Sequence, residues 1–221
     1  MSAIEQLTPH RIDQAVAGEH LYLISPQELE DPTIRGEFLS KIYTEHACGV
    51  IDLSNDIEQV AEEFMAQVSD ADFKVIDEED RKHEIYYFDG SEKTQIELKL
   101  EHLSRMLGGE NARPVNMFVS RYSPGDRFDF HIDLPGDPLE GFLPVEALSV
   151  IYPLYGSKAF EFKDENGVTR NLQQQPGQVL IFRGASLSAD NSDIMQGVEH
   201  RVPETQEYSA MATCDIMIEG K

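Results

Sequence analysis

Hydrophobic residues in the first half of the chain recur mainly at the spacing of amphipathic helices. One such segment begins near residues 31–33 and a second near residues 54–56, each after residues typical of a helix start. A third covers about residues 92–107 and ends at two glycines. Short strands are expected at 50–53 and 84–88. Residues 1–113 are therefore expected to be mainly helical.

After Pro114 the pattern changes to short β-rich runs separated by Gly, Pro, Asp and Asn. No helical crossover pattern lies between these runs, which argues against a parallel α/β sheet. The expected strands are 116–122, 127–132, 148–155, 159–162, 169–172, 178–182, 198–202 and 208–218. So many short strands in about a hundred residues are typical of an antiparallel barrel or jelly roll.

Composition is that of an ordinary soluble globular chain, but the charge is unusual. Of the 221 residues 40% are hydrophobic, and 18 basic residues face 41 acidic ones, a formal net charge of −23. Such a surface repels phosphate backbones, so no nucleic-acid partner is expected. The acidic shell serves solubility or attracts a cationic substrate, and the sequence leaves both readings open.

The sequence carries no sign of export or of membrane insertion. The N-terminus lacks a basic segment followed by an apolar run, and no apolar stretch approaches the roughly 18 residues of a membrane span. Cys48 and Cys214 lie far apart and form no C-x-x-C pair. We therefore expect a cytoplasmic protein with two free thiols.

A candidate metal site lies in the β-rich half. His131 and Asp133 are two residues apart, so on a strand both side chains point to one face. A later strand that carries His200 can bring a third ligand to the same place. Two imidazoles and one carboxylate leave coordination positions open, which suits a non-haem Fe(II) oxygenase.

Several motifs then resemble one superfamily. Residues 120–126 (Ser-Arg-Tyr-Ser-Pro-Gly-Asp) with His131-Ile132-Asp133 resemble the R-Y-x-P-G-x(5)-H-x-D stretch of 2-oxoglutarate/Fe(II) dioxygenases, prolyl hydroxylases among them. Residues 148–154 and 176–182 are similar to the strands that follow, and His200-Arg201-Val202 is similar to the distal histidine motif. The resemblance covers roughly residues 115 to 218.

The resemblance implies an α+β, mainly β chain with one domain over residues 1–221. Residues 114–221 would form a cupin-like double-stranded β-helix, and residues 1–113 would form a helical support and lid. It also implies a dioxygenase that uses Fe(II), O₂ and 2-oxoglutarate to hydroxylate or otherwise oxidise a small molecule or an amino-acid side chain. Substrate identity and oligomeric state stay open.

The resemblance also assigns roles to single residues. His131, Asp133 and His200 would bind iron, while Tyr122 and Ser209 would lie at the cosubstrate. Iron halogenases of this superfamily replace the carboxylate ligand with a small residue, so an intact Asp133 indicates hydroxylation or a related oxidation.

One position departs from the superfamily pattern. The last strand usually carries an Arg or Lys for the far carboxylate of 2-oxoglutarate, whereas this chain has Glu207 in Glu207-Tyr208-Ser209. We expect Arg183 to supply the missing charge, with Arg121 as second choice. If neither does so, two alternatives remain: an Fe(II) oxygenase of the same fold without 2-oxoglutarate, or a cupin-like metal-binding protein without catalysis.

Overall fold

A computed structural model describes residues 21–45, 47–88, 93–110, 112–133, 146–187, 194–195 and 197–218. The first half contains β1 (Leu21–Ile24), α2 (Pro26–Leu29), α3 (Pro32–Thr44), β2 (Cys48–Asp52), η3 (Ser54–Asp56), α4 (Ile57–Gln67), η4 (Asp70–Asp72), β3 (Lys74–Asp77), β4 (Arg81–Tyr87) and α5 (Gln95–Gly108). The second half contains β5 (Arg113–Tyr122), β6 (Arg127–His131), β7 (Glu146–Tyr155), β8 (Lys158–Lys163), β9 (Thr169–Gln174), β10 (Gln178–Arg183), β11 (Ser186–Leu187), β12 (Ile194–Met195), β13 (His200–Val202) and β14 (Ser209–Ile218).

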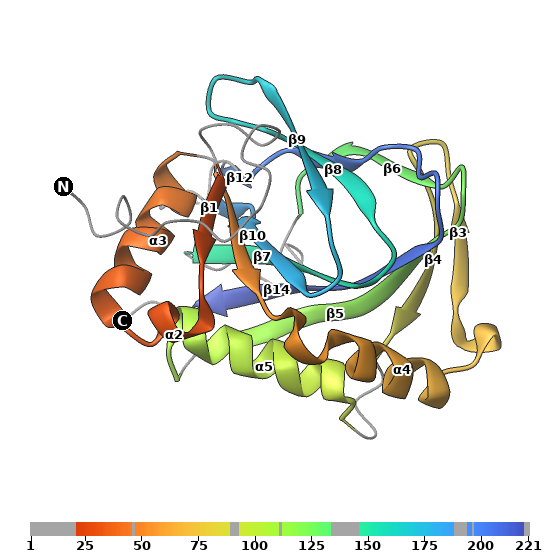
Figure 1. The fold of residues 1–221 in the computed structure, drawn as a ribbon. Helices are drawn as coiled ribbons and strands as arrows, with labels where there is room; N and C mark the ends of the chain where they lie inside the picture. The colour runs from red at the N-terminus through yellow and green to blue at the C-terminus, as the bar shows by residue number, and fades with distance from the viewer. Residues whose placement is uncertain are drawn as a thin grey trace.

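Twelve of the described strands form one curled sheet that encloses an interior (Figure 1). The strand order is β1-β2-β10-β7-β14-β5-β4-β6-β13-β8-β9, with β3 paired to β4. Among the described pairs, β1 with β2 is parallel and the others are antiparallel. The predicted mainly β, double-stranded β-helix architecture is confirmed.

The inner face of the sheet has its own apolar core. In β8 buried and half-buried residues alternate, so Lys158, Phe160 and Phe162 point inward. In β10, Leu180 and Phe182 join this inner core, whereas Val179 and Ile181 belong to the outer one. The inner core consists of Cys48, Val50, Tyr122, Ile151, Phe160, Phe162, Leu172, Leu180, Phe182, Val198, Val202 and Met211.

Helices cover the outer face of one half of the sheet, which explains why β7 and β10 are buried on both sides. Helices α4 and α5 pack on β7, β5 and β14, and α3 packs on β10 (Figure 1). Helix α5 begins at Gln95, later than the expected residue 92, because Thr94 and Glu97 form a capping box there.

The N-terminal half contributes more strand than its sequence pattern indicated. Besides its helices it supplies β1 to β4. Strand β4 lies between β5 and β6, and β2 extends the sheet beside β10. Such pairings join segments far apart in the chain, so helix-like periodicity nearby does not reveal them. Strands from both halves of the chain therefore share one sheet.

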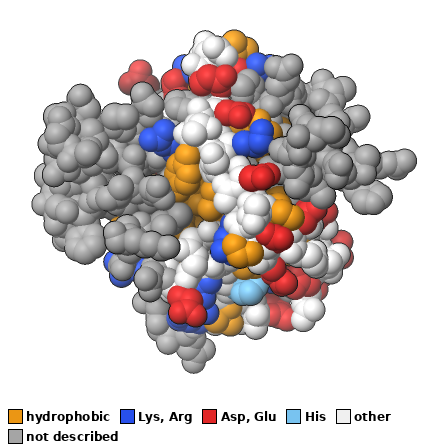
Figure 2. Space-filling view, turned by 90° about the vertical axis from the view of Figure 1, so that its left-hand side faces the viewer, with side chains coloured by type: hydrophobic (Ala, Val, Ile, Leu, Met, Phe, Trp, Pro, Cys, Tyr) orange, Lys and Arg blue, Asp and Glu red, His pale blue; other side chains and the backbone are white. Residues whose placement is uncertain are grey.

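The structure also bears on the expectations about membrane insertion, free thiols and surface charge. Within the described residues no helix is long and apolar enough to cross a membrane. Cys48 and Cys214 are both buried and free. On the described part of the face in Figure 2, acidic and basic side chains are interspersed in the upper part, and acidic side chains predominate at the lower right.

Candidate metal and cosubstrate site

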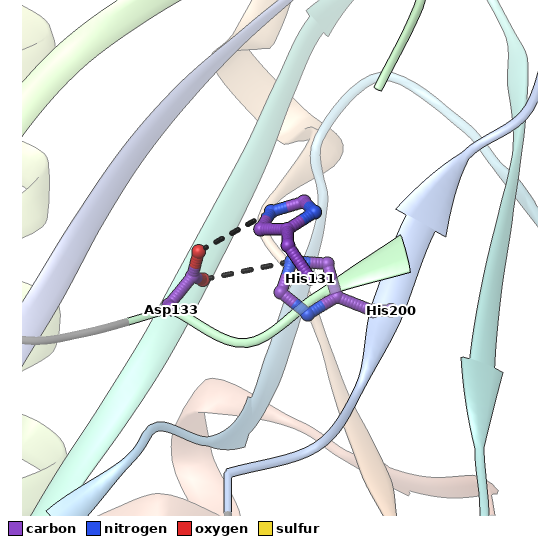
Figure 3. Close-up of side chains that lie close together, drawn as sticks. All are labelled: His131, Asp133 and His200. Carbon is purple, nitrogen blue, oxygen red and sulfur yellow. Dashed lines mark ion pairs between the residues drawn. The ribbon is translucent and has the colours of Figure 1, made fainter. Parts of the chain in front are cut away.

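The structure brings His131, Asp133 and His200 together at one end of the barrel interior (Figure 3). His131 ends β6, Asp133 follows two residues later, and His200 begins β13 directly opposite His131 in the strand register. The Nε2 atoms of His131 and His200 lie 3.5 Å and 3.6 Å from the two Asp133 oxygens. One ligand atom of each residue lies within 4.8 Å of the others.

Backbone hydrogen bonds fix how both imidazoles are oriented. Nδ1 of His131 lies 2.8 Å from the Asp129 carbonyl oxygen, and Nδ1 of His200 lies 3.0 Å from that of Val198. Because a carbonyl only accepts, these contacts assign the hydrogen to Nδ1 and leave an Nε2 lone pair facing Asp133. Lone pairs that face carboxylate oxygens across such a gap suit a cation between them. The three residues therefore fit a divalent metal with open positions, as Fe(II) requires.

The pKa shifts of His200 and Asp133 favour metal binding at neutral pH. Burial lowers the pKa of His200, which keeps its imidazole neutral. Burial raises the pKa of Asp133, but His200, His131 and a hydrogen bond from Ser149 lower it further than burial raises it. A neutral His200 imidazole and an ionised Asp133 carboxylate are the forms that bind metal.

Aromatic rings hold the two imidazoles in place. The Phe128 ring stacks on His131 with 3.6 Å between centroids, and the Phe182 ring lies 4.5 Å from His200. A small cavity of about 30 Å³ adjoins the triad. It is lined by Phe118, Ser120, Tyr122, Phe128, His131, Asp133, Ile151, His200, Val202, Met211 and Thr213.

Lys158 is a buried amine in the same barrel, and the sequence pattern gave no sign of it. It is 5% exposed, and no described group lies within hydrogen-bond distance of its Nζ. Its Nζ lies 3.6 Å from the centroid of the Tyr122 ring. Burial lowers the pKa of Lys158 well below its usual value. A buried amine without a counter-ion is costly, so a site for an anion is its simplest explanation.

Other polar groups around Lys158 also lack partners within the described structure. Gln174 pairs with Lys158 across β8 and β9, and both polar atoms of its side-chain amide are unsatisfied. Tyr122 pairs with Ser209 across β5 and β14, and both hydroxyls are likewise buried and unsatisfied. An amine, an amide and two hydroxyls are donors suited to a carboxylate. We call Lys158, Gln174, Tyr122 and Ser209 the inner polar pocket.

The expected role of Arg183 is not supported by its position. It shares the outer face of β10 with Val179 and Ile181, and its guanidinium donates to the Tyr43 carbonyl oxygen at 3.2 Å. Strand alternation therefore directs it toward α3 and away from the triad. Glu207, the acid at the usual anchor position, is exposed.

Arg121, the second choice, also faces outward, as does Arg201 beside His200. Arg121 pairs with Glu84 and Asp70 on the face opposite Tyr122, and Arg201 pairs with Glu161. The basic group inside the barrel comes instead from β8.

A buried carboxylate, Asp215, lies near the triad and is held by two neutral side chains. The Ser149 hydroxyl donates to Asp215 Oδ1 at 3.2 Å, and the Asn116 amide donates to Asp215 Oδ2 at 3.0 Å. Asp215 is 7% exposed, and burial together with the nearby charge of Asp133 raises its pKa. Asn116 has a φ of 53°, and the β5–β14 register shifts beside it, as at a β-bulge.

The chain is similar to known proteins in its fold and not in its sequence. No protein-family model matches the sequence, and no curated protein matches it either. The fold, in contrast, matches solved structures of iron and 2-oxoglutarate oxygenases.

Three of these structures illustrate the likeness. A Pseudomonas putida prolyl-4-hydroxylase has a TM-score of 0.61 and 13% identity, over 84% of this chain and 100% of the other. A viral collagen prolyl hydroxylase from Paramecium bursaria Chlorella virus-1, in complex with 2-oxoglutarate, has a TM-score of 0.57 and 14% identity, over 79% of this chain and 97% of the other. The non-haem α-ketoglutarate-dependent epimerase SnoN from nogalamycin biosynthesis has a TM-score of 0.59 and 11% identity, over 85% of this chain and 84% of the other. At such identities the likeness establishes the fold.

Proposed function

We propose that this protein is an Fe(II)- and 2-oxoglutarate-dependent dioxygenase that oxidises a small molecule or an amino-acid side chain. The observation that carries the proposal is the placement of the His131–Asp133–His200 triad and the unpaired Lys158 inside one barrel. The fold it shares with prolyl hydroxylases and an epimerase supports the same class.

Three residues of the chain bind the metal at which the reaction takes place. His131, Asp133 and His200 hold the iron, and their Nδ1 hydrogen bonds keep both histidines in the binding tautomer. Bound iron supplies O₂ activation at its open positions. Overall, 2-oxoglutarate gives up CO₂ and becomes succinate with one oxygen atom, while the other oxygen atom oxidises the substrate.

The inner polar pocket receives the far carboxylate of the cosubstrate. Lys158 lies four residues along β8 from Phe162, which pairs with His200. Four strand residues span about 13 Å. A lysine side chain and a five-carbon dicarboxylate reaching toward each other can bridge this span. Tyr122, Ser209 and Gln174 then donate hydrogen bonds to the carboxylate that Lys158 neutralises.

Lys158 also separates this proposal from the first alternative. An iron oxygenase without 2-oxoglutarate was motivated by the missing base on the last strand. A buried amine from β8 supplies that charge, so the missing base on the last strand no longer argues against 2-oxoglutarate as the cosubstrate. The intact Asp133 further favours hydroxylation or a related oxidation over halogenation.

Metal binding is the first test. Anaerobic Fe(II) titration of the purified protein should give one ion per chain, and Asp133→Ala or His200→Ala should weaken the affinity sharply while circular dichroism stays unchanged. A variant that binds iron as well as wild type would refute the triad assignment. Succinate formed from 2-oxoglutarate in air by wild type, and not by His200→Ala, would separate the enzyme from a non-catalytic metal protein.

A further inference from the structure

We propose that Asp215 receives a positively charged nitrogen of the substrate, so that the enzyme acts on amines, guanidines or residues that carry them. This inference names the substrate class and rests on the proposed function. Its basis is a buried carboxylate beside the triad that neutral side chains position and no described cation neutralises.

Asp215 lies on the wall of the barrel interior. Along β14, residues Met211 and Thr213 line the cavity, and the next inward position is Asp215. Its register partner on β7 is Ser149, which precedes the lining residue Ile151 by two positions. The carboxylate therefore faces the same interior as the triad.

The two ends of this wall differ in charge. Ser209, at one end of β14, belongs to the inner polar pocket with Lys158, where the cosubstrate carboxylate would bind. Asp215 lies six residues further along, about 20 Å of strand. The Ser149 hydroxyl donates to Asp215, and the nearby charge of Asp133 acts on Asp215, so this end adjoins the metal ligands. With the Lys158 end taken by the cosubstrate, the Asp215 end is left for the substrate.

The contacts of Asp215 hold it in place without neutralising it. Ser149 and Asn116 each donate one hydrogen bond to a different carboxylate oxygen, and both donors are neutral. Within the described residues no Lys, Arg or His forms an ion pair with Asp215. The bulge at Asn116 turns its amide inward to reach Asp215, which is an unusual backbone arrangement for a non-glycine residue.

The sum of formal charges inside the barrel indicates that a cation is missing beside Asp215. In the loaded enzyme the formal charges of Fe(II), Asp133, 2-oxoglutarate and Lys158 cancel. Asp215 adds a buried carboxylate that no described cation faces, and a cation bound there would hold it in its charged form. A substrate cation would do so, and the net charge of −23 would raise its local concentration.

An independent polar group points into the same space. Thr213 is 8% exposed, lines the cavity, and its Oγ1 has no hydrogen-bond partner within the described residues. It lies one inward position from Asp215, between that carboxylate and the inner polar pocket. A substrate nitrogen on Asp215 can thus find a second acceptor in the Thr213 hydroxyl.

The test uses fragments that share a chain length and differ in charge. The full-length protein is loaded with Mn(II) and 2-oxoglutarate, because Mn(II) broadens the NMR signals of ligands bound near it. The probes are butylammonium, butylguanidinium, butanamide and butanoate. We expect broadening from the two cations only, weakened about tenfold or more in Asp215→Asn, as expected for loss of a charge-assisted hydrogen bond.

Controls keep the outcomes distinct. Glu207→Gln removes the same charge from the surface and should leave the broadening unchanged, and Asp215→Ala repeats the test without an amide. Failure to bind Mn(II) or 2-oxoglutarate would count against the proposed function itself. With both bound, equal broadening in wild type and Asp215→Asn, binding of butanamide or butanoate as strong as the cations, or no broadening at all would overturn the role of Asp215.

Discussion

At the scale of single residues, the chemistry depends on where a few charges are buried. His131, Asp133 and His200 were predictable because strand alternation and motif spacing determine which side chains share a face. Lys158 was not predictable, since a lysine between Ser157 and Ala159 resembles an ordinary surface residue at a strand start. Only the pairing of β8 with β9 and β13 shows that it points into the barrel.

Lys158→Met tests the cosubstrate anchor. The methionine fills the same space without the charge, so the affinity for 2-oxoglutarate should fall about ten- to a hundredfold, the size of a lost charge-assisted pair. Arg183→Ala is the matched control and should leave the affinity unchanged, because Arg183 donates to Tyr43 outside the barrel. Calorimetric titration of the Mn(II)-loaded protein measures both. The reverse pattern would restore Arg183 as the anchor.

Lys158 also gives the stability of the protein a pH dependence. Burial lowers the pKa of Lys158, so the unfolded chain holds a proton on this amine at pH values where the folded chain does not. Protons therefore favour unfolding between the lowered and the usual pKa, and Lys158 makes the free protein more stable as pH rises through that window. Urea unfolding at a series of pH values should show this slope in wild type and a smaller slope in Lys158→Met. Identical slopes would contradict it.

Cosubstrate binding should reverse that shift. A carboxylate beside Lys158 favours the charged amine, so binding of 2-oxoglutarate should take up protons at pH values above the lowered pKa of the free protein. Calorimetry in buffers of different ionisation enthalpy measures this uptake. Wild type should show uptake that Lys158→Met lacks, and equal uptake in the two proteins would show that another group titrates.

At the scale of elements, turns set how strands enter the sheet. The Pro176-Gly177 turn precedes β10, and Gly177 has a φ of 80°. Its N–H donates to the Pro153 carbonyl and its own carbonyl accepts from Leu53, which joins β10 to the ends of two neighbouring strands. The motif was visible in the sequence, but its contact with residues near Ser54 depends on tertiary structure.

Gly177→Ala should therefore destabilise the fold. A Cβ at Gly177 would lie 2.4 Å from Ser54 Cα, in addition to the strain of a positive φ. We expect a loss of about 2–4 kcal/mol in the free energy of unfolding. Gly167→Ala is the control, because Gly167 has a φ of 73° and nothing within 4 Å of an added Cβ. Chemical denaturation should show the smaller loss for Gly167→Ala, and equal losses would mean that Ser54 yields easily.

At the scale of the whole molecule, the β half was predictable and the sheet's full extent was not. Alternating apolar runs after Pro114 correspond to β5 to β10, β13 and β14. The insertion of β4 between β5 and β6 was not foreseen, because no local pattern encodes a partner far away in the chain. Two members of the inner polar pocket, Tyr122 and Ser209, were expected at the cosubstrate, whereas Lys158 and Gln174 were missed because they come from other strands, β8 and β9.

The net charge of −23 gives a prediction for the whole molecule. Self-repulsion among acidic side chains weakens the folded state, and salt screens it. If this repulsion is worth about 1 kcal/mol, moving from roughly 20 mM to roughly 300 mM NaCl should raise Tm by about 2–4 °C. Scanning calorimetry of the metal-free protein provides the measurement. An unchanged or lower Tm would show that local ion pairs outweigh the net repulsion.

Chelation of iron by the cosubstrate tests the central claim most directly. Anaerobic addition of 2-oxoglutarate to the Fe(II)-loaded protein should produce the visible metal-to-ligand charge-transfer band of a chelated 2-oxo acid. The band should be absent in His200→Ala and should require more 2-oxoglutarate in Lys158→Met. A wild-type protein that binds Fe(II) yet shows no band at millimolar 2-oxoglutarate would contradict the account.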